Sequence, residues 1–565
     1  MKHRSPDAAT GRPLPRHKVS TNKNPCTAEQ WRRAIAATQQ FEGRDVVHQI
    51  LHKRRGRPRE FTADAWIAAH FLHSQLIKGI LHETAVTETI RAWNGKQRAQ
   101  VGLAPDRPVT YRMVEDATRK INQALANKAV AGWSLTRFVN AALAASIPSS
   151  YPATGAIALD STDIETTARF CATKPVIDAD PDGPPRPNQE RGERLVRRAD
   201  ERTRRVAVKG ADGRYVYTAD PDARMGWRTA KNGRDTFCGY DAHVATDVRR
   251  IGGPDVPHIA RSLAVAPAGT NKGRPGLDAV DAVLERHHVT ELLIDRGYNG
   301  LRADSFVLPA WARGLTVIVD LHPTMHRGRH PGAQPGTVWI DGNLYSTCLP
   351  KAFWDLPAPD HPNKNDTDAQ RQAKVALQAK FDYRAAWAFS PLSKRDRDGY
   401  QRFKGPAIAG TVRSPRHPPS MRLPHDRPTS ACTPDKPCGC AITVTVSPKE
   451  YPTARNPMPW GTTRWARSYY RRNGIESTFS ELKANRFAFA RGSIRGFGLA
   501  RHTTLLAFAL AGLNITLLKE WNENRGQRDP WAVKLGEPGM SRQAPRRRKR
   551  RRTESIAPEP PFENL

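Results

Sequence analysis

Hydrophobic residues recur at spacings of three and four along residues 61–79, 83–94 and 109–146. This period places them on one face of an α-helix, so each of the three segments predicts amphipathic helices. Residues 1–60 carry 14 Lys or Arg against 5 Asp or Glu. We therefore predict a basic, helical N-terminal domain over residues 1–150 that grips DNA.

The pattern changes near residue 154, where short β-like runs begin to alternate with helical stretches. Runs with strand character, among them TGAIALD, TFCGYDAHVATD and PHIARSLAVAPA, precede the segment LDAVDAVLERH, which has helical spacing. The apolar runs ELLID and LTVIVD follow it. Three strands followed by a strand and helix alternation predict an α/β fold, with a mixed sheet flanked by helices. We assign residues 151–320 to the first part of this core.

Residues 321–465 have a different character. The triplet DGN between VWI and LYS predicts a hairpin, and the stretch from Gly405 to Pro459 is rich in proline. We expect a β- and loop-rich insertion here, followed by the second part of the core over residues 466–520. The apolar run at 503–518 has 16 residues, which is short for a bilayer span, and predicts a buried helix. Residues 521–565 end in a strongly basic run and are expected to form a disordered tail.

The net charge of the chain narrows the classes of molecule that it is expected to bind. The chain has a formal net charge of +35 and a pI near 10.4, which favours a polyanion such as nucleic acid as its normal partner. A ribosome-associated or merely basic protein is the alternative on charge alone. The N-terminus is not followed by an apolar run, and the seven cysteines suggest no disulfide framework, so we expect a cytoplasmic protein.

One short segment combines acidic, basic and phenolic side chains. Tyr469, Arg472, Glu476 and Lys483 follow one another at offsets of three, four and seven. On a regular helix, at about 100° per residue, they fall within about 60° of one another. Such a face suits a carboxylate that holds a metal ion while its neighbours bind phosphates. The Asn-Gly pair at 473–474 can break a helix, in which case Tyr469 and Arg472 would reach the site from a loop.

Two further carboxylates directly follow apolar strand-like runs. Cutting or joining phosphodiesters with two metal ions requires acids that converge on both ions, and the ends of strands meet at one edge of a sheet. Asp160 in IALDST and Asp295 in LLIDRGY meet this condition, and Asp320 in VIVDL is the rival of Asp295. For each of them a turn-capping role is the alternative. Four nearby acids are interpreted as strand-face and turn residues: Asp163, Glu165, Asp241 and Asp247.

These residues resemble a known family. The spacing Tyr-x2-Arg-x3-Glu-x6-Lys is similar to the signature of a large group of bacterial insertion-sequence transposases of the DDE type, whose catalytic core is RNase H-like. The segment 490–514 also resembles the end of that catalytic domain. The resemblance covers roughly residues 154–520 with gaps.

The resemblance implies specific roles. Asp160, Asp295 and Glu476 would be the catalytic, metal-binding triad, with two Mg²⁺ ions for which Mn²⁺ would substitute. Tyr469, Arg472 and Lys483 would hold phosphates of the element's inverted-repeat ends. The expected activity is metal-dependent phosphodiester hydrolysis and strand transfer by a homodimer on double-stranded DNA, in association with a bacterial nucleoid. The alternatives are a domesticated, non-catalytic DNA-binding protein and a stand-alone metal-dependent nuclease of the same fold.

Three weaker signals remain. Arg55 and Arg57 lie in RRGRPRE, which resembles the Arg-Gly-Arg-Pro hooks that enter a minor groove, although a plain basic linker is the alternative. Cys432, Cys438 and Cys440 could begin a zinc site with a histidine or Cys348, but no paired CxxC module is present and we expect no zinc. The family often uses a tryptophan of the insertion to support a flipped base, and the candidates are Trp339, Trp354, Trp387, Trp460 and Trp465.

Overall fold

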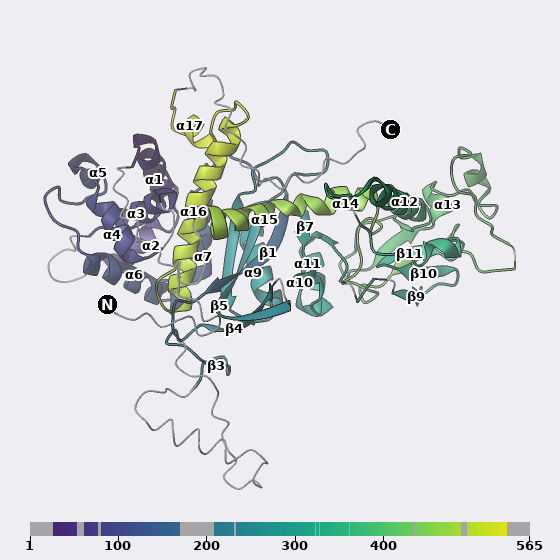
Figure 1. The fold of residues 1–565 in the computed structure, drawn as a ribbon, viewed down its shortest axis with the longest axis horizontal. Helices are drawn as coiled ribbons and strands as arrows, with labels where there is room; N and C mark the ends of the chain where they lie inside the picture. The colour runs from purple at the N-terminus through teal and green to yellow at the C-terminus, as the bar shows by residue number, and fades with distance from the viewer. Residues whose placement is uncertain are drawn as a thin grey trace, which may run out of the picture.

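The computed structural model describes ten stretches of the chain. They are residues 26–52, 61–76, 81–169, 208–230, 233–322, 324–326, 328–360, 362–433, 435–486 and 494–538. The protein is a mixed α/β structure in which a central sheet separates a group of helices at one end from a smaller β-rich part at the other (Figure 1).

The N-terminal part is helical, as its periodicity predicts. Its helices are α1 (Ala28–Gln40), α2 (Arg44–Leu51), α3 (Ala63–Leu76), α4 (Glu83–Arg91), α5 (Gly95–Gln100), α6 (Tyr111–Ala126) and α7 (Leu135–Ala145). Capping boxes begin two of them: Thr27 with Gln30 at α1, and Asn94 with Gln97 at α5. Each box satisfies backbone N–H groups that a helix start leaves without partners.

The central sheet has six strands. They are β1 (Ala156–Glu165), β4 (Arg224–Ala230), β5 (Gly233–Asp247), β6 (Ala260–Pro267), β7 (Glu291–Ile294) and β8 (Thr316–Val319). β5 pairs antiparallel with β4, β6 and β1, whereas β1, β7 and β8 are parallel neighbours. The mixed sheet predicted from the sequence is therefore present. β7 and β8 end level with the middle of β1, which continues beside β5 to Glu165.

Alternation along the strands gives the sheet two buried faces. In β5, Tyr240, Ala242 and Val244 pack with the N-terminal helices, whereas Ala245 packs on the opposite face. The second face is covered by α9 (Gly273–Leu284) and α11 (Val307–Ala312), which follow β6 and precede β8. Burial on both faces explains why the parallel segments AIAL of β1, ELLI of β7 and TVIV of β8 are almost continuously apolar.

The longest helix, α16 (Leu499–Glu523), joins the N-terminal helices to the sheet. It packs against α3 and α7, and Asn514 binds the backbone of Ala260 in β6 with both its amide oxygen and its amide nitrogen. α16 has the length and apolar character of a membrane span, but 83% of its most apolar window is buried inside the protein. The predicted buried helix is thus confirmed, and it belongs to the core.

The expectation of a disordered tail from residue 521 is wrong for residues 521–538. α16 continues to Glu523, and α17 (Pro530–Lys534) follows it. Trp531 is fully buried, and its indole N–H donates to the carbonyl of Ser146 at 3.0 Å. A large apolar side chain in a polar segment therefore holds this segment on the core, while residues 539–565 lie outside the described part of the chain.

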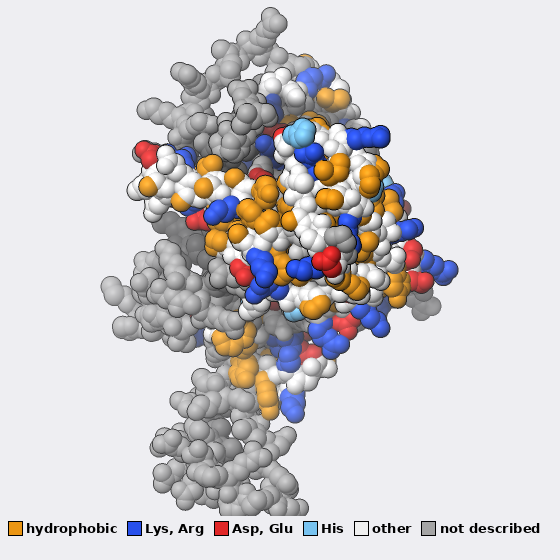
Figure 2. All heavy atoms as spheres, turned by 90° about the vertical axis from the view of Figure 1, so that its right-hand side faces the viewer, with side chains coloured by type: hydrophobic (Ala, Val, Ile, Leu, Met, Phe, Trp, Pro, Cys, Tyr) orange, Lys and Arg blue, Asp and Glu red, His pale blue; other side chains and the backbone are white. Residues whose placement is uncertain are grey.

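The part between β8 and α14 is rich in short strands and loops. Its strands are β9 (Arg329–Pro331), β10 (Thr337–Ile340), β11 (Asn343–Ser346), β12 (Ser390–Pro391), β13 (Gln401–Lys404) and β14 (Thr443–Val446), and its helices are α12 (Asp368–Ala385) and α13 (Pro406–Ala409). They form two three-stranded sheets, β11-β10-β9 and β12-β13-β14. We call residues 321–462 the insertion. Figure 2 looks onto this end of the molecule and shows basic and apolar side chains interspersed over it.

The predicted hairpin in the insertion is confirmed. β10 and β11 are antiparallel and are joined by Asp341 and Gly342, both of which have positive φ. This is the backbone that a tight two-residue hairpin requires, and it explains the Asp-Gly pair. The Asp341 carboxylate accepts a hydrogen bond at 2.8 Å from Arg384 of α12, whose guanidinium is fully buried against Phe381.

The remaining elements are short. They are β2 (Val208–Lys209), β3 (Tyr215–Val216), α10 (Arg296–Asn299), α14 (Thr463–Tyr469), α15 (Asn473–Ser480), 3-10 turns at Ala303–Ser305, Lys351–Phe353, Pro418–Arg422 and Tyr470–Arg472, and a π-helical turn at Glu481–Asn485.

Candidate active site

Asp160 and Asp295 lie side by side at the edge where the parallel strands end. Leu159 of β1 pairs with Ile294 of β7, so the next residue on each strand is one of the two acids. The Asp160 side chain is 13% exposed. Its burial, together with the negative charge of Asp295, raises the pKa of Asp160 to about 6, although Arg472 acts in the opposite direction. Two acids that disfavour each other's charge form a site that attracts cations.

Asp295 also begins a helix. Its carboxylate accepts hydrogen bonds from the backbone N–H groups of Gly297 at 3.0 Å and Tyr298 at 3.3 Å, the first turn of α10. The capping role that we weighed as the alternative is therefore real. It does not compete with the position at the strand edge, because the cap fixes the orientation of the carboxylate beside Asp160.

Asp320, the rival of Asp295, lies at the same edge one strand further on. Val319 of β8 pairs with Ile294, so Asp320 occupies the equivalent position. Its two carboxylate oxygens are both engaged by protein donors: the indole N–H of Trp460 at 2.9 Å and the guanidinium of Arg296 at 2.8 Å. Asp320 is thus tied to the insertion and to α10.

Glu476 is linked to the strand edge by Arg472. The guanidinium of Arg472 donates to Asp160 Oδ2 at 3.0 Å and to Glu476 Oε1 at 2.6 Å. The Glu476 side chain is 56% exposed, whereas Arg472 is nearly buried. Among the described residues, no set of three acids that includes Glu476 brings its oxygens within 4.8 Å of one another. The structure therefore brings Asp160 and Asp295 together and holds Glu476 across a guanidinium from them.

The segment that carries Glu476 is not one regular helix, which corrects the simple angular argument. α14 ends at Tyr469, a 3-10 turn covers Tyr470–Arg472, and α15 starts at Asn473, with a π-helical turn after Ser480. In Figure 1 α14 and α15 still follow one almost continuous path along the sheet. The Asn-Gly pair does not interrupt the helical backbone, which includes all four residues of the predicted face: Tyr469, Arg472, Glu476 and Lys483.

Gly474 has a specific reason to be glycine. A Cβ at this position would lie 2.1 Å from ring atoms of His258, which precedes β6. In the next turn, the Thr478 hydroxyl donates to the carbonyl of His258 at 2.9 Å. Ile475, Phe479 and Leu482 form an adjoining apolar face and are buried. Close docking on the His258 segment thus sets the position of α15 and of Glu476.

Tyr469 and Lys483 occupy different environments. The ring of Tyr469 is buried, stacked on Trp465 at 5.1 Å between ring centroids, and the Arg472 guanidinium lies 5.7 Å from its centroid. The ring of Tyr469 thus packs against the guanidinium of Arg472. Lys483 is partly exposed, and its ammonium group contacts Asp163 Oδ1 at 2.6 Å. Although burial acts in the opposite direction, Lys483 holds the pKa of Asp163 below its usual value.

Sequence reasoning missed Lys272. Its ammonium group donates to the Ser161 hydroxyl at 2.8 Å, next to Asp160, and its charge lowers the pKa of Asp160 against the larger effect of burial. Lys272 lies at the start of α9, in the sequence NKGRPG, and no spacing in that segment relates it to β1. Only the crossing of α9 over the sheet brings it to the site.

The other predicted contacts fall into two groups. Arg55 and Arg57 lie outside the described residues. Of the five candidate tryptophans, Trp354 is half-buried and donates to the carbonyl of Leu349 at 2.8 Å, and the other four are buried. The buried ones are Trp339, Trp387, Trp460 and Trp465. None of these four has a surface position from which to stack on a base in this conformation.

The donor set at the strand edge suits a hard divalent cation. Asp160, Asp295 and Glu476 offer carboxylate oxygens only, which is the chemistry that Mg²⁺ and Mn²⁺ prefer. Burial and the charge of Asp295 raise the pKa of Asp160, so a cation bound there would stabilise its charged form. The Glu476 carboxylate is more exposed than Asp160, and its described partner is Arg472. Neither the comparison with protein-family models nor that with curated proteins finds a match for this chain.

Proposed function

We propose that the protein is a DNA transposase of the DDE type, which binds the ends of its mobile element and catalyses phosphodiester hydrolysis and strand transfer. The observation that carries the proposal is the position of Asp160 and Asp295 on adjacent parallel strands, with Arg472 joining Glu476 to them. The spacing of residues 469–483 supports the same assignment independently.

The strand arrangement also supports an RNase H-like core. Along the path β6-β5-β1-β7-β8, the first three strands are antiparallel and the last two continue parallel to β1. A mixed sheet flanked by helices is what the resemblance implies for such a core. The insertion lies between β8 and α14, which is the interval where members of the group carry a β-rich insertion.

Each residue of the site has a role in this proposal. Asp160, Asp295 and Glu476 would hold two Mg²⁺ ions, which when bound would activate the attacking oxygen and stabilise the leaving one. Arg472 neutralises Asp160 and Glu476 before DNA arrives. Arg472 would then bind a phosphate of the DNA end in place of Glu476, and the Glu476 carboxylate would be free to turn toward Asp160.

Lys483 is placed to hold the DNA end. Its partner Asp163 lies three residues after Asp160 on β1. A phosphate that replaced Asp163 as the partner of Lys483 would therefore lie close to Asp160. Double-stranded DNA carrying inverted repeats is the proposed substrate, and a homodimer on that DNA is the proposed assembly. The net charge of +35 supports a polyanionic partner.

Substitution of Glu476 tests the proposal. The substrate is a duplex that carries the inverted repeats found beside the gene in its genome. Glu476→Gln should abolish Mg²⁺-dependent nicking of this duplex and leave binding largely intact, because the amide cannot replace a carboxylate metal ligand. The matched control is Glu481→Gln on the same helical segment, where Glu481 pairs with Arg486; it should nick normally.

Several outcomes separate the alternatives. Unimpaired nicking by Glu476→Gln would overturn the assignment of the site. Cleavage of duplexes without inverted repeats, with no strand joining, would identify a nuclease, and binding without any nicking by the unmodified protein would identify a non-catalytic DNA-binding protein.

A further inference from the structure

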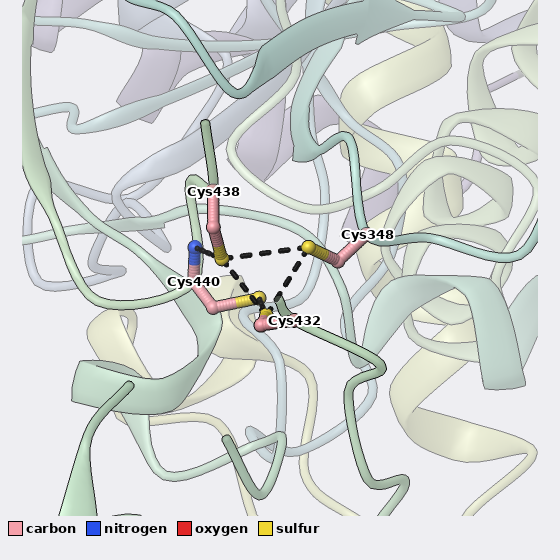
Figure 3. A group of neighbouring side chains, drawn as sticks. All are labelled: Cys348, Cys432, Cys438 and Cys440. Atoms are coloured by element: carbon pink, nitrogen blue, oxygen red, sulfur yellow. Dashed lines mark hydrogen bonds between the residues drawn. The ribbon is translucent and has the colours of Figure 1, made fainter. Parts of the chain in front are cut away.

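Four cysteine side chains meet inside the insertion, and one of them lies far from the other three in sequence. Cys348 follows β11, and Cys432, Cys438 and Cys440 belong to the loop that precedes β14. Figure 3 shows all four sulfur atoms directed at a common centre. They lie within 4.8 Å of one another, and among the described residues they are the set of His, Cys, Asp and Glu side chains that converges this closely.

The distances fit four ligands of one ion better than disulfides. The Sγ atom of Cys348 lies 3.2 Å from that of Cys432 and 3.4 Å from that of Cys438, and Cys432 lies 2.9 Å from Cys438 and 3.8 Å from Cys440. A disulfide requires about 2.05 Å. A tetrahedral ion with four Zn–S bonds of about 2.3 Å separates its sulfur atoms by about 3.8 Å.

Polar groups surround the sulfur atoms in a way that suits thiolates. The backbone N–H of Cys440 donates to Cys438 Sγ at 3.3 Å, and the Ser414 hydroxyl donates to Cys432 Sγ at 3.5 Å. The hydroxyl of Ser346 lies 3.2 Å from Cys440 Sγ. Donors around the ligands orient them and stabilise their negative charge, as in established metal sites.

Two glycines allow the cysteine loop to approach the β10 hairpin. A Cβ at Gly439 would lie 2.4 Å from the carbonyl oxygen of Gly336, and a Cβ at Gly336 would lie 2.7 Å from the backbone of Cys438. Gly336 also has a positive φ of 83°. Side chains are thus excluded at both positions, and the backbone contact places Cys438 and Cys440 beside Cys348.

We propose that Cys348, Cys432, Cys438 and Cys440 bind one structural Zn²⁺ ion that joins the two small sheets of the insertion. Four thiolates in a tetrahedral arrangement favour zinc and leave no open position for catalysis. Binding converts four thiols to thiolates and releases up to four protons to solvent. The inference is independent of the proposed function, and it reverses our expectation from sequence that zinc is absent.

A metal ion also meets a need of this part of the fold. The two sheets have three short strands each, and the apolar clusters around Trp387 and Trp339 are small. Small units with little core are often stabilised by a structural metal ion. The cysteine cluster lies where the end of β11 meets the start of β14, so one ion there would hold both sheets together.

Metal content of the purified full-length chain tests this inference. The protein, prepared without a polyhistidine tag, should contain about one zinc per chain by elemental mass spectrometry. Cys432→Ser and Cys440→Ser should each lower the zinc content at least several-fold, because a serine hydroxyl is a poor ligand for zinc. Cys26→Ser is the matched control, since Cys26 lies at the start of α1 and contacts Gln97; it should retain the zinc.

A second measurement does not depend on the variants folding. Replacing the zinc of the unmodified protein with Co²⁺ should produce the intense sulfur-to-cobalt absorption and the visible bands of a tetrahedral thiolate site. Chelation should make the insertion, residues 321–462, more sensitive to protease than the N-terminal helices. Stoichiometric iron, four titratable thiols without metal, or disulfides detected by mass spectrometry after alkylation would each overturn the proposal.

Discussion

Arg472 decides the arrangement of the candidate active site at the scale of single residues. It is nearly buried, it stacks near Tyr469, and it contacts both Asp160 and Glu476. A buried arginine between two acids offsets charges that would otherwise repel each other. The same guanidinium is suited to bind a phosphate in a bidentate manner. Arg472 therefore connects the state without DNA to the proposed DNA-bound state.

Asp295 and Asp320 allow a matched test of which strand-end acid is the metal ligand. The Asp320 carboxylate already accepts hydrogen bonds from Trp460 and Arg296, whereas Asp295 lies next to Asp160. We expect Asp295→Asn to reduce Mg²⁺-dependent nicking by more than the roughly 10- to 100-fold that follows the loss of a group supporting a metal ligand. Asp320→Asn should retain most of the nicking activity and lower the thermal midpoint. The reverse pattern of initial rates would assign the site to Asp320.

At the scale of elements, the segment from α14 to the π-helical turn packs on the core and thereby positions the side chains of the site. A 3-10 turn precedes α15 and a π-helical turn follows it. Such departures from the regular helix re-aim side chains, and they occur frequently at functional sites. They place Arg472 over the acids at the strand ends and Lys483 over Asp163.

Gly474→Ala tests this docking. The added methyl group would overlap the ring of His258, so we expect the free energy of unfolding to fall by about 1–3 kcal/mol, as for other over-packed positions. Nicking should fall as well, because α15 carries Glu476. The matched control is Gly95→Ala in α5, where the nearest atom to the new Cβ is 3.9 Å away; this change should be neutral or stabilising.

The double variant Gly474→Ala with His258→Ala completes the test. Removal of the imidazole should relieve the overlap and restore part of the lost stability, measured by denaturant unfolding. Additive losses in the double variant would show that the glycine is needed for another reason.

At the scale of the whole molecule, one apolar core unites parts that are distant in sequence. The largest apolar cluster includes residues of the N-terminal helices, of the sheet and of α16. The N-terminal helices and the central sheet are therefore expected to move as a unit. The insertion has small clusters of its own, but Leu356, Phe381, Met458 and Trp460 join it to the largest cluster. It contacts the site through Trp460, which donates to Asp320.

The net charge predicts how DNA binding depends on salt. Neutralising phosphates releases counterions, so affinity for a duplex should fall by about 10³- to 10⁵-fold between about 50 and 200 mM salt if 6–10 phosphates are contacted. Lys483→Gln should reduce the slope of log affinity against log salt by about 1. Lys519→Gln is the control, because Lys519 of α16 pairs with Glu29 of α1. Fluorescence anisotropy measures both, and an affinity that is insensitive to salt would contradict a phosphate-based interaction.

Much of the fold was predictable because it depends on local pattern. Helical spacing predicted the N-terminal helices, the Asp-Gly pair predicted the β10–β11 hairpin, and the apolar run at 503–518 predicted the core of α16. The tail was mispredicted because one tryptophan, Trp531, outweighs the surrounding charges once a pocket beside Ser146 is available. Local composition contains no information about such a pocket.

The sequence by itself determined the identity of the acids and cations and the positions of Asp160, Asp295 and Asp320 directly after apolar runs. These features depend on the period of the backbone and on neighbouring residues. Only the tertiary structure decided that Asp160 lies beside Asp295, that Arg472 separates Glu476 from them, that Lys272 joins the site and that Cys348 completes the cysteine cluster. Each of these contacts joins residues far apart in the chain, and long-range packing sets them rather than any spacing within a single segment.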